Sequence, residues 1–236
     1  MKKIIAIGGG TLLSTDSINK FIIKQYNKNS KLLFIPTASN DSVEYINNIK
    51  NYFLKLNIQV DVLYLFNENI SLDNIKNQIN DADIIYVGGG NTLKMINKWK
   101  KFKINELLIN AYNSNKIMCG ISAGSICWFS HGNSDSRKFK NKKASLIRVS
   151  GLGIIKLLNC PHYSQEQDRK ESLKKMTKKT KQVAIALDNN VAIFFKNNKF
   201  KILRSDNHCY AYKVYWKKNI FFEEKLENYE EFIKFK

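Results

Sequence analysis

The sequence lacks the cysteine spacing that a disulfide framework or a zinc site needs. Its four cysteines form no C-x-x-C pair, and three lie inside apolar runs, which favours reduced and mostly buried thiols. Cys160 precedes Pro161-His162, where a cysteine can be a nucleophile, but an inert buried thiol is the more common outcome. No zinc-ligand spacing is present, so we expect neither a metal nor an organic cofactor. The cysteines are Cys119, Cys127, Cys160 and Cys209.

Long apolar runs and a leader-like segment are also missing. No run reaches the length of a membrane span, and residues 1–7 lead directly into a glycine loop. We therefore expect a cytoplasmic protein without a membrane partner. The chain has 236 residues, 44% of them hydrophobic, and shows no linker, repeat or low-complexity tract. These features predict one domain over residues 1–236.

Acidic residues are scarce, at 20 against 39 Lys and Arg, which gives a formal net charge of +19. Such a balance ordinarily suggests a nucleic acid or another polyanion as partner. Here the lysines are spread among Asn and Ile through every segment, and the densest basic groups, 137–143 and 174–181, contain few aromatic residues for base stacking. We predict that nucleic acid is not the primary partner.

The first half of the chain alternates short apolar strands with helical patterns. The loop Gly8-Gly9-Gly10-Thr11 has neither G-x-G-x-x-G nor G-K-[ST], so a nucleotide site is poorly supported. The alternation is typical of an α/β fold with a three-layer, doubly wound and mostly parallel sheet. We predict strands at 2–7, 31–35, 60–65, 83–87 and 116–119, and helices ending near Tyr26 and at 41–56, 72–79 and 92–111.

The second half changes character. An apolar helix is predicted from Ser122 onward, with His131 at its far end, and a charged helix is predicted at 166–176. Short apolar runs then alternate with Asp-Asn and Asn-Asn turn signals, which predicts antiparallel hairpins built from 183–187, 191–195, 200–203 and 209–216. The tail 223–236 is predicted to be a helix or partly frayed.

Four sharp loops follow the predicted parallel strands and should converge on one edge of the sheet. Ligands of such sheets bind beyond the carboxyl ends of the strands. The loop Gly120-Ile121-Ser122-Ala123-Gly124 matches G-x-S-x-G, in which glycines allow a tight strand-to-helix turn that exposes the serine. A serine that merely caps a helix is the alternative. The other loops are 8–11, 36–39 and 88–92.

A nucleophilic serine needs a base, and the base needs an orienting partner. Of the three histidines, His208 lies in the late hairpins and His131 lies about a helix length from Ser122, whereas the Pro-His-Tyr loop leaves His162 able to reach the edge. For the orienting acid, Asp135 lies between serine and histidine in a small polar loop, and Asp188 competes with it.

These residues resemble peptidase family S51, which includes peptidase E, an α-aspartyl dipeptidase, and cyanophycinase-like proteins on a fold like that of class I glutamine amidotransferases. The resemblance implies Ser122 as nucleophile, His162 as base and the 88–92 loop as oxyanion and substrate-binding region. For the acid we predict Asp135, with Asp188 as the alternative. The segments that carry it are Ile35-Pro36-Thr37-Ala38, Gly88-Gly89-Gly90-Asn91-Thr92, Gly120 to Ser125, Cys127-Trp128-Phe129, Ser134-Asp135-Ser136, Gly151-Leu152-Gly153 and Pro161-His162-Tyr163.

We therefore predict a serine-type peptidase that cleaves short peptides, including dipeptides with an N-terminal Asp, through an acyl-enzyme. An aspartyl substrate would need a nearby cation, for which Arg169 and Arg137 are the candidates. Another amide hydrolase on the same fold and a non-catalytic module that binds an anion or metabolite are the alternatives. The sequence leaves open whether the chain forms a homodimer. The predicted oxyanion and substrate-binding residues are Gly89, Gly90, Asn91, Thr92, Ala123 and Arg169.

Overall fold

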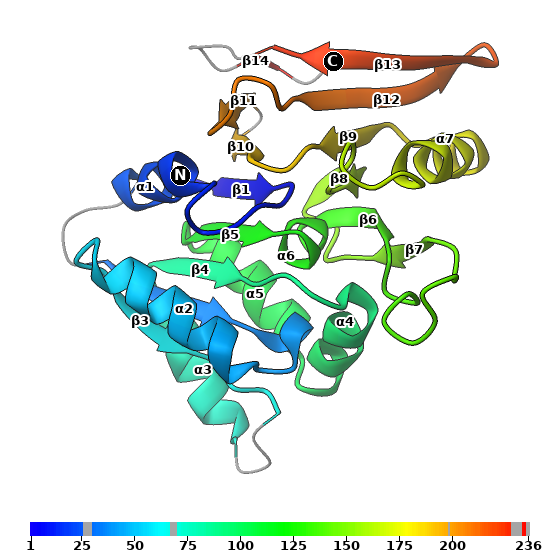
Figure 1. The fold of residues 1–236 in the computed structure, drawn as a ribbon. Helices are drawn as coiled ribbons and strands as arrows, with labels where there is room; N and C mark the ends of the chain where they lie inside the picture. The colour runs from blue at the N-terminus through cyan, green and yellow to red at the C-terminus, as the bar shows by residue number, and fades with distance from the viewer. Residues whose placement is uncertain (26–29, 67–69, 198, 228–232, 235–236) are drawn as a thin grey trace.

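The larger of two β-sheets forms the centre of the computed structural model, which describes residues 1–25, 30–66, 70–197, 199–227 and 233–234 (Figure 1). In the described residues this sheet has the order β14-β11-β10-β1-β5-β4-β2-β3. The five strands from β1 to β3 are parallel, and β10, β11 and β14 extend the β1 edge in antiparallel fashion. The strands are β1 (Lys3–Ile7), β2 (Lys31–Ile35), β3 (Gln59–Val62), β4 (Ile84–Val87), β5 (Ile117–Ile121), β10 (Val191–Lys196), β11 (Lys199–Arg204) and β14 (Ile233–Lys234).

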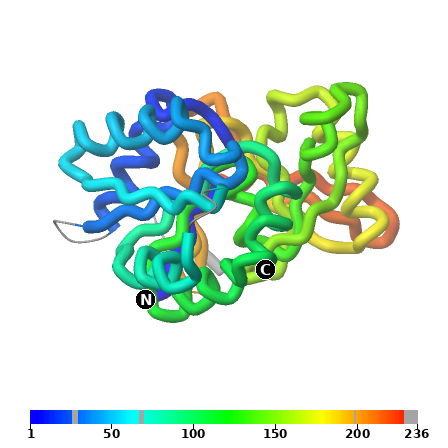
Figure 2. The backbone as a smooth tube through the Cα atoms, turned by 90° about the horizontal axis from the view of Figure 1, so that it is seen from below, coloured from blue at the N-terminus to red at the C-terminus, as the bar shows by residue number. Residues whose placement is uncertain are grey.

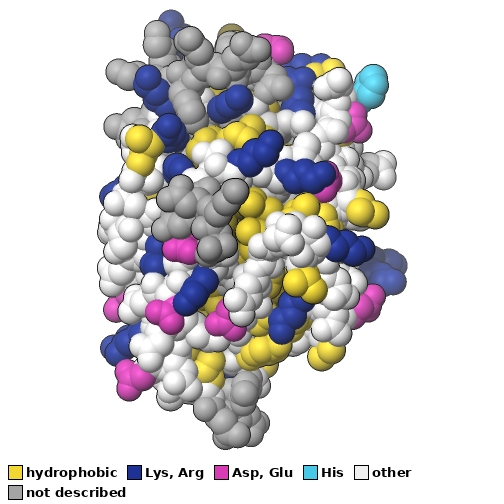
Figure 3. Space-filling view, turned by 90° about the vertical axis from the view of Figure 1, so that its left-hand side faces the viewer, with side chains coloured by type: hydrophobic (Ala, Val, Ile, Leu, Met, Phe, Trp, Pro, Cys, Tyr) yellow, Lys and Arg dark blue, Asp and Glu magenta, His cyan; other side chains and the backbone are white. Residues whose placement is uncertain are grey.

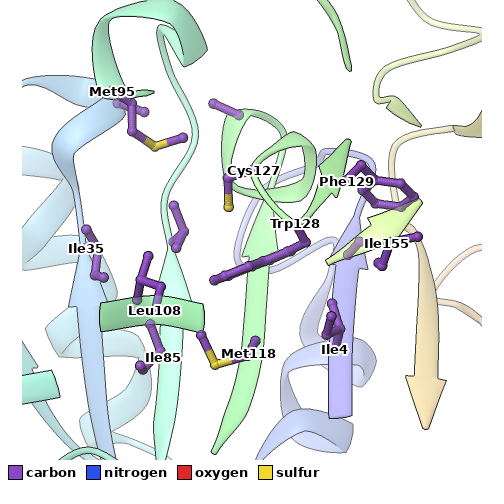
Figure 4. Close-up of a cluster of buried hydrophobic side chains, with 14 of the residues drawn as sticks. Ile4, Ile35, Ile85, Met95, Leu108, Met118, Cys127, Trp128, Phe129 and Ile155 are labelled. Carbon is purple, nitrogen blue, oxygen red and sulfur yellow. The ribbon is translucent and has the colours of Figure 1, made fainter. Parts of the chain in front are cut away.

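Helices cover both faces of this sheet, as predicted for a doubly wound α/β fold. Helices α1 (Asp16–Lys24) and α2 (Val43–Leu54) pack on one face, while α3 (Leu72–Asp81), α4 (Thr92–Lys101) and α5 (Ile104–Asn113) pack on the other. Alternate residues of β1 enter the two cores: Ile5 faces α1 and α2, and Ile4 faces the opposite side. Figure 4 shows Leu108 of α5 close to the inward-pointing side chains of neighbouring strands. The predicted fold class is confirmed.

A second sheet continues the chain after the serine turn, with the order β13-β12-β9-β8-β6-β7 in the described residues. Helix α7 (Arg169–Thr180) packs against it, and one cluster of buried side chains runs from the first sheet into the second. Figure 2 shows the blue and cyan N-terminal elements on one side and the yellow-green segment on the other. The strands are β6 (Phe129–Ser134), β7 (Ile147–Ser150), β8 (Ile155–Cys160), β9 (Ala184–Leu187), β12 (Ala211–Lys217) and β13 (Ile220–Leu226).

Several predicted elements are corrected by the structure. The helix after the serine, α6, spans only Ala123–Ile126, and β6 carries His131. The predicted helix 92–111 is two helices, because Lys103 adopts a left-handed conformation with φ of 54°. Strands β9 and β10 do not form a hairpin, since β9 pairs with β8 and β12 whereas β10 joins β1 and β11. A C-terminal helix was predicted at 223–236, but residues 223–226 belong to β13 and 233–234 form β14. Residues 228–232 and 235–236 lie outside the described residues, as does Tyr26, where the first helix was predicted to end.

The described surface agrees with the dispersed charge pattern of the sequence. On the face shown in Figure 3, Lys and Arg side chains are spread among other surface residues and do not form one continuous stripe. In the part of the chain that the structure describes, we find no helix with the length and apolar character of a bilayer-spanning segment.

Candidate active site

Ser122 lies on the sharp turn between β5 and α6, at the carboxyl end of the parallel strands. Its backbone has φ of 57° and ψ of −110°, a conformation that costs an L-residue energy and that the surrounding turn must impose. A Cβ atom on Gly120 would overlap the Gly124 carbonyl, and one on Gly124 would overlap the Val87 carbonyl. Because these overlaps involve backbone atoms, both positions require glycine. The G-x-S-x-G turn is therefore sterically determined, as the sequence predicts.

His162 follows β8 and brings its imidazole to Ser122. Its Nε2 lies 2.8 Å from the Ser122 Oγ, and its Nδ1 lies 2.6 Å from the Asn189 Oδ1. An amide oxygen only accepts hydrogen bonds, so the Nδ1–H donates to Asn189 and Nε2 is left to accept the serine proton. The sequence-based pairing of Ser122 with His162 is thus present in the structure. His131 lies on β6, and His208 is exposed in a turn.

Asn189 is the residue that the sequence reasoning missed. It follows β9, and its backbone N–H donates to the Gln165 Oε1 at 2.8 Å, while the next N–H, of Asn190, donates to the Gly9 carbonyl at 2.9 Å. Its neighbour Asp188, the alternative acid, is buried and accepts the backbone N–H groups of residues 164 and 210 at 3.0 and 2.9 Å. Asp188 therefore fixes the turn that presents Asn189.

Asp135, predicted as the orienting acid, contacts a different partner. Its Oδ2 lies 3.6 Å from the Arg169 guanidinium, and the hydrogen bond at the His162 Nδ1 goes to Asn189. Sequence order between serine and histidine suggested Asp135, but this residue directly follows β6 of the second sheet and contacts Arg169, the first residue of α7. Asp135 is therefore not the residue that orients His162 in this structure.

Arg169, predicted to bind an acidic substrate group, is engaged within the protein. The side chain is 2% exposed; its Nε donates to the Glu166 Oε2 at 2.6 Å and its Nη1 to the Asn133 carbonyl at 2.7 Å. Together with the Asp135 contact, these interactions use both ends of the guanidinium. Arg137, the other candidate cation, is exposed on the turn after β6. The structure thus leaves Arg169 poorly placed to receive a substrate carboxylate.

The 88–92 loop lies directly beside the serine. A Cβ atom on Gly89 would lie 3.4 Å from the Ser122 Cβ, and the Gly89 N–H donates to the Tyr45 hydroxyl at 3.3 Å. Gly90 has φ of 134°, where glycine is favoured. The predicted loop is therefore next to Ser122. The Gly90 N–H of this loop and the Ala123 N–H in the first turn of α6 are the candidate hydrogen-bond donors to an anion.

Asn91 and Thr92, predicted to bind substrate, use their side chains to hold this loop. The Asn91 Oδ1 accepts the Lys94 N–H at 3.0 Å and so caps α4, while its Nδ2 donates to the Ser136 carbonyl at 3.0 Å. Thr92 is buried and accepts a hydrogen bond of 3.2 Å from the Ser134 hydroxyl. Both residues tie the loop to the segment around Asp135.

The environment lowers the pKa of His162 below its ordinary value of 6.5. Burial is the main cause, and the positive charge of Arg169 is the second; the hydrogen bond to Asn189 and the charges of Glu166 and Asp135 act in the opposite direction. The imidazole is thus neutral, and able to accept a proton, at neutral pH. Burial raises the pKa of Cys160 to about 12, which agrees with an inert thiol.

Comparison with known proteins identifies the family of this chain. The model of peptidase family S51 matches residues 4–203. The chain is 33% identical over 220 residues to "Uncharacterized peptidase YgaJ" of Bacillus subtilis, covering 91% of this chain and 92% of that protein, and 29% identical to "Uncharacterized peptidase PM1590" of Pasteurella multocida, covering 77% and 87%.

Two solved structures share the fold. One is a peptidase from an acI-B1 Actinobacterium, with a TM-score of 0.75, 18% identity and coverage of 100% of this chain and 97% of that one. The other is a Listeria monocytogenes protein described as a candidate peptidase E, with a TM-score of 0.65, 21% identity and coverage of 86% and 98%. The matched residues and the curated relatives establish membership: the chain belongs to peptidase family S51, a family of serine-type peptidases.

Proposed function

We propose that the chain hydrolyses short peptides through an acyl-enzyme formed on Ser122. The Ser122 Oγ attacks the scissile carbonyl while the His162 Nε2 takes its proton, and the imidazolium then gives this proton to the leaving amine. A water molecule, deprotonated by the same nitrogen, then attacks the ester carbonyl; the bond to the Ser122 Oγ breaks, the imidazolium returns the proton to this oxygen, and the acid product is released. The observation that supports this sequence most directly is the continuous chain of contacts from the Ser122 Oγ through His162 to Asn189, at 2.8 and 2.6 Å.

We assign Asn189 the orienting role in this relay. Its oxygen holds the tautomer that leaves Nε2 as acceptor, but as a neutral amide it adds no negative charge to stabilise the imidazolium. The relay is therefore Ser-His-Asn. For the tetrahedral intermediate we assign the N–H groups of Ala123 and Gly90 as donors, because the Gly89 N–H already has the Tyr45 hydroxyl as acceptor.

Labelling and hydrolysis measured together test this proposal. A fluorophosphonate should modify the intact protein at Ser122, and mass spectrometry of the digest should locate the adduct on that peptide. The same preparation should hydrolyse members of a dipeptide and tripeptide panel. A protein that neither reacts with the probe nor cleaves any peptide would instead support the non-catalytic binding module.

The pH dependence of hydrolysis should reflect the lowered pKa of His162. Because only the neutral imidazole accepts the serine proton, kcat/KM should rise through an acid limb that lies below pH 6.5. In Asn189→Asp, a carboxylate at Nδ1 favours the imidazolium and raises the pKa, so the limb should move to higher pH by about 1 to 2 units. The measurement is kcat/KM against pH for both proteins.

Asn190→Asp is the matched control, because it adds the same charge in the same turn, whereas the His162 Nδ1–H donates its hydrogen bond to Asn189. Its acid limb should shift less than that of Asn189→Asp. Equal limbs in the wild type and Asn189→Asp would show that Asn189 does not orient the base.

A further inference from the structure

A hollow lined mostly by charged residues is formed in part by the segment that follows His162. Its volume is about 600 Å³, and it is lined by Asp135, Lys138, Glu166, Gln167 and Asp168. Glu166 lies one turn of chain after His162, and its backbone N–H donates to the His162 carbonyl at 3.2 Å. We call this hollow the acidic recess.

The opposite side of the recess is tied to the loop beside Ser122. Asp135 lies between two serines that bind this loop: the Ser134 hydroxyl donates to Thr92, and the Ser136 hydroxyl accepts the Leu93 N–H at 2.9 Å. The loop includes Gly89, which is adjacent to the nucleophile. The acidic recess is therefore joined to the base through the turn 162–166, and to the glycine loop through the serines on either side of Asp135.

The accessible charge of the recess is negative although the protein as a whole is strongly positive. Three carboxylates line it against one lysine, and Lys138 is already paired with Asp168 at 2.7 Å. The Arg169 guanidinium lies beneath it and is 2% exposed, whereas the side chains of Asp135 and Glu166 are 32% and 34% exposed. A substrate would thus meet carboxylate oxygens, while the buried cation holds them in place.

Asp135 and Glu166 each retain one carboxylate oxygen for a ligand. Arg169 contacts the Oδ2 of Asp135, at the long distance of 3.6 Å, and the Oε2 of Glu166. Among the described residues, no side-chain or backbone donor to the Asp135 Oδ1 is found. An ammonium group has three hydrogen-bond donors. It therefore suits two carboxylates that are both held in place by Arg169.

We propose, on the basis of the peptidase function above, that Asp135 and Glu166 bind the ammonium group of the peptide substrate. The carboxylate of an N-terminal aspartate would face these two acids, and the nearest cations, Lys138 and Arg169, are already paired with carboxylates, so aspartyl peptides are poor substrates. The ammonium has two sources, the free α-amino group of the peptide and the side chain of a lysine. Both present the same chemistry to the recess.

Kinetics with a small peptide panel test this inference and separate the two sources. The panel is Ala-Leu, Lys-Leu, Asp-Leu, N-acetyl-Ala-Leu and N-acetyl-Lys-Leu. Ala-Leu should be cleaved with a higher kcat/KM than Asp-Leu, and N-acetyl-Ala-Leu should be cleaved poorly. Retained cleavage of N-acetyl-Lys-Leu identifies the side chain as the ammonium source, and its loss identifies the α-amino group.

Asp135→Asn should raise KM for the ammonium-bearing peptides by about 10- to 100-fold with little change in kcat, as expected for loss of a charge-assisted contact made equally in ground and transition states. Asp135→Glu should restore part of the affinity. Asp73→Asn, which removes one exposed carboxylate on α3, is the matched control and should behave as wild type. Thermal melting of each variant separates lost binding from lost folding.

Each result has a defined meaning. A preference for Asp-Leu, an unchanged KM in folded Asp135→Asn, or no cleavage of the panel by a protein whose Ser122 reacts with a fluorophosphonate would overturn the ammonium assignment alone. Absence of both labelling and cleavage would overturn the proposed peptidase activity itself.

Discussion

Replacing Ser122 with alanine should lower kcat for peptide hydrolysis by about 10⁴-fold or more, because removing the nucleophile leaves only substrate binding and the oxyanion donors to assist an attack by water. The free energy of unfolding should change little. Alanine has the same Cβ atom as serine and meets the same backbone strain at φ of 57°, and the lost hydroxyl contributes one partly exposed hydrogen bond, to His162. Single-turnover and steady-state hydrolysis, together with thermal melting, measure both quantities.

Ser125→Ala provides the control within the same motif. Ser125 is buried and donates to the Asn159 Oδ1 at 3.0 Å, away from the imidazole. Its removal should leave hydrolysis within a few-fold of wild type and lower the free energy of unfolding by about 1 kcal/mol, the usual effect of one lost buried hydrogen bond. Persistent activity in Ser122→Ala, with a normal Ser125→Ala, would rule out Ser122 as the nucleophile.

Gly9→Ala is the second change for which we expect a large loss, of about 100-fold or more in kcat/KM, the effect of displacing a catalytic group by about 1 Å. A methyl group at this position would overlap the Asn189 Oδ1 and the His162 Nδ1 and Cε1 atoms. These are side-chain atoms, so the protein can fold if the imidazole and the amide move apart. That movement breaks the 2.6 Å hydrogen bond and misaligns Nε2 with the serine.

Two further variants show whether the loss arises from the catalytic geometry. Leu13→Ala changes an exposed side chain a few residues away and should retain full activity. Gly124→Ala places its methyl group against the Val87 backbone, which cannot move without disturbing the sheet, and should destabilise the whole fold. Gly9→Ala should therefore melt near the wild-type temperature while losing activity. Wild-type kcat/KM in Gly9→Ala would contradict the close packing that we describe around His162.

Periodicity was sufficient to predict the parallel half of the fold. Apart from the edge strand β3, the strands of that half are short apolar runs buried on both faces, and helices with one apolar stripe separate most of them. The apolar pattern of the sequence therefore matches the packing. The pattern failed at 127–134, because a short apolar run is compatible with a buried strand as well as a helix. It also failed at Lys103, which adopts a left-handed conformation without being a glycine.

A turn signal near the C-terminus was overlooked. Lys218 and Asn219 both have positive φ, of 50° and 63°, which is the geometry of a two-residue hairpin loop between β12 and β13. The asparagine, between two runs of aromatic and aliphatic residues, was the available evidence for this strand pair. The allocation of β9 and β10 to different sheets depends on long-range pairing, for which the local sequence gives no signal.

The candidate site was predictable where chemistry restricts the residue type. A tight turn requires the glycines around Ser122, and the chain has three histidines, so the pairing of Ser122 with His162 could be predicted. The orienting position requires only an oxygen that accepts from Nδ1–H, and an amide meets that requirement as well as a carboxylate. A search restricted to acids therefore led to Asp135 and Asp188. Asp188 directly precedes Asn189 in the chain.

The allocation of β9 and β10 to separate sheets also determines when the enzyme becomes competent during its own synthesis. A ribosome delivers the chain from its N-terminus, so the turn that carries Ser122 is made before β8, β9 and Asn189. The 188–190 turn must first dock on Gly9, and β10 must pair with the free edge of β1. Before these steps, Asn189 cannot fix the tautomer of His162, and His162 is not aligned with Ser122. In the proposed mechanism, Ser122 of the nascent chain is therefore inactive until the second sheet has closed on the first, and hydrolysis should begin only then.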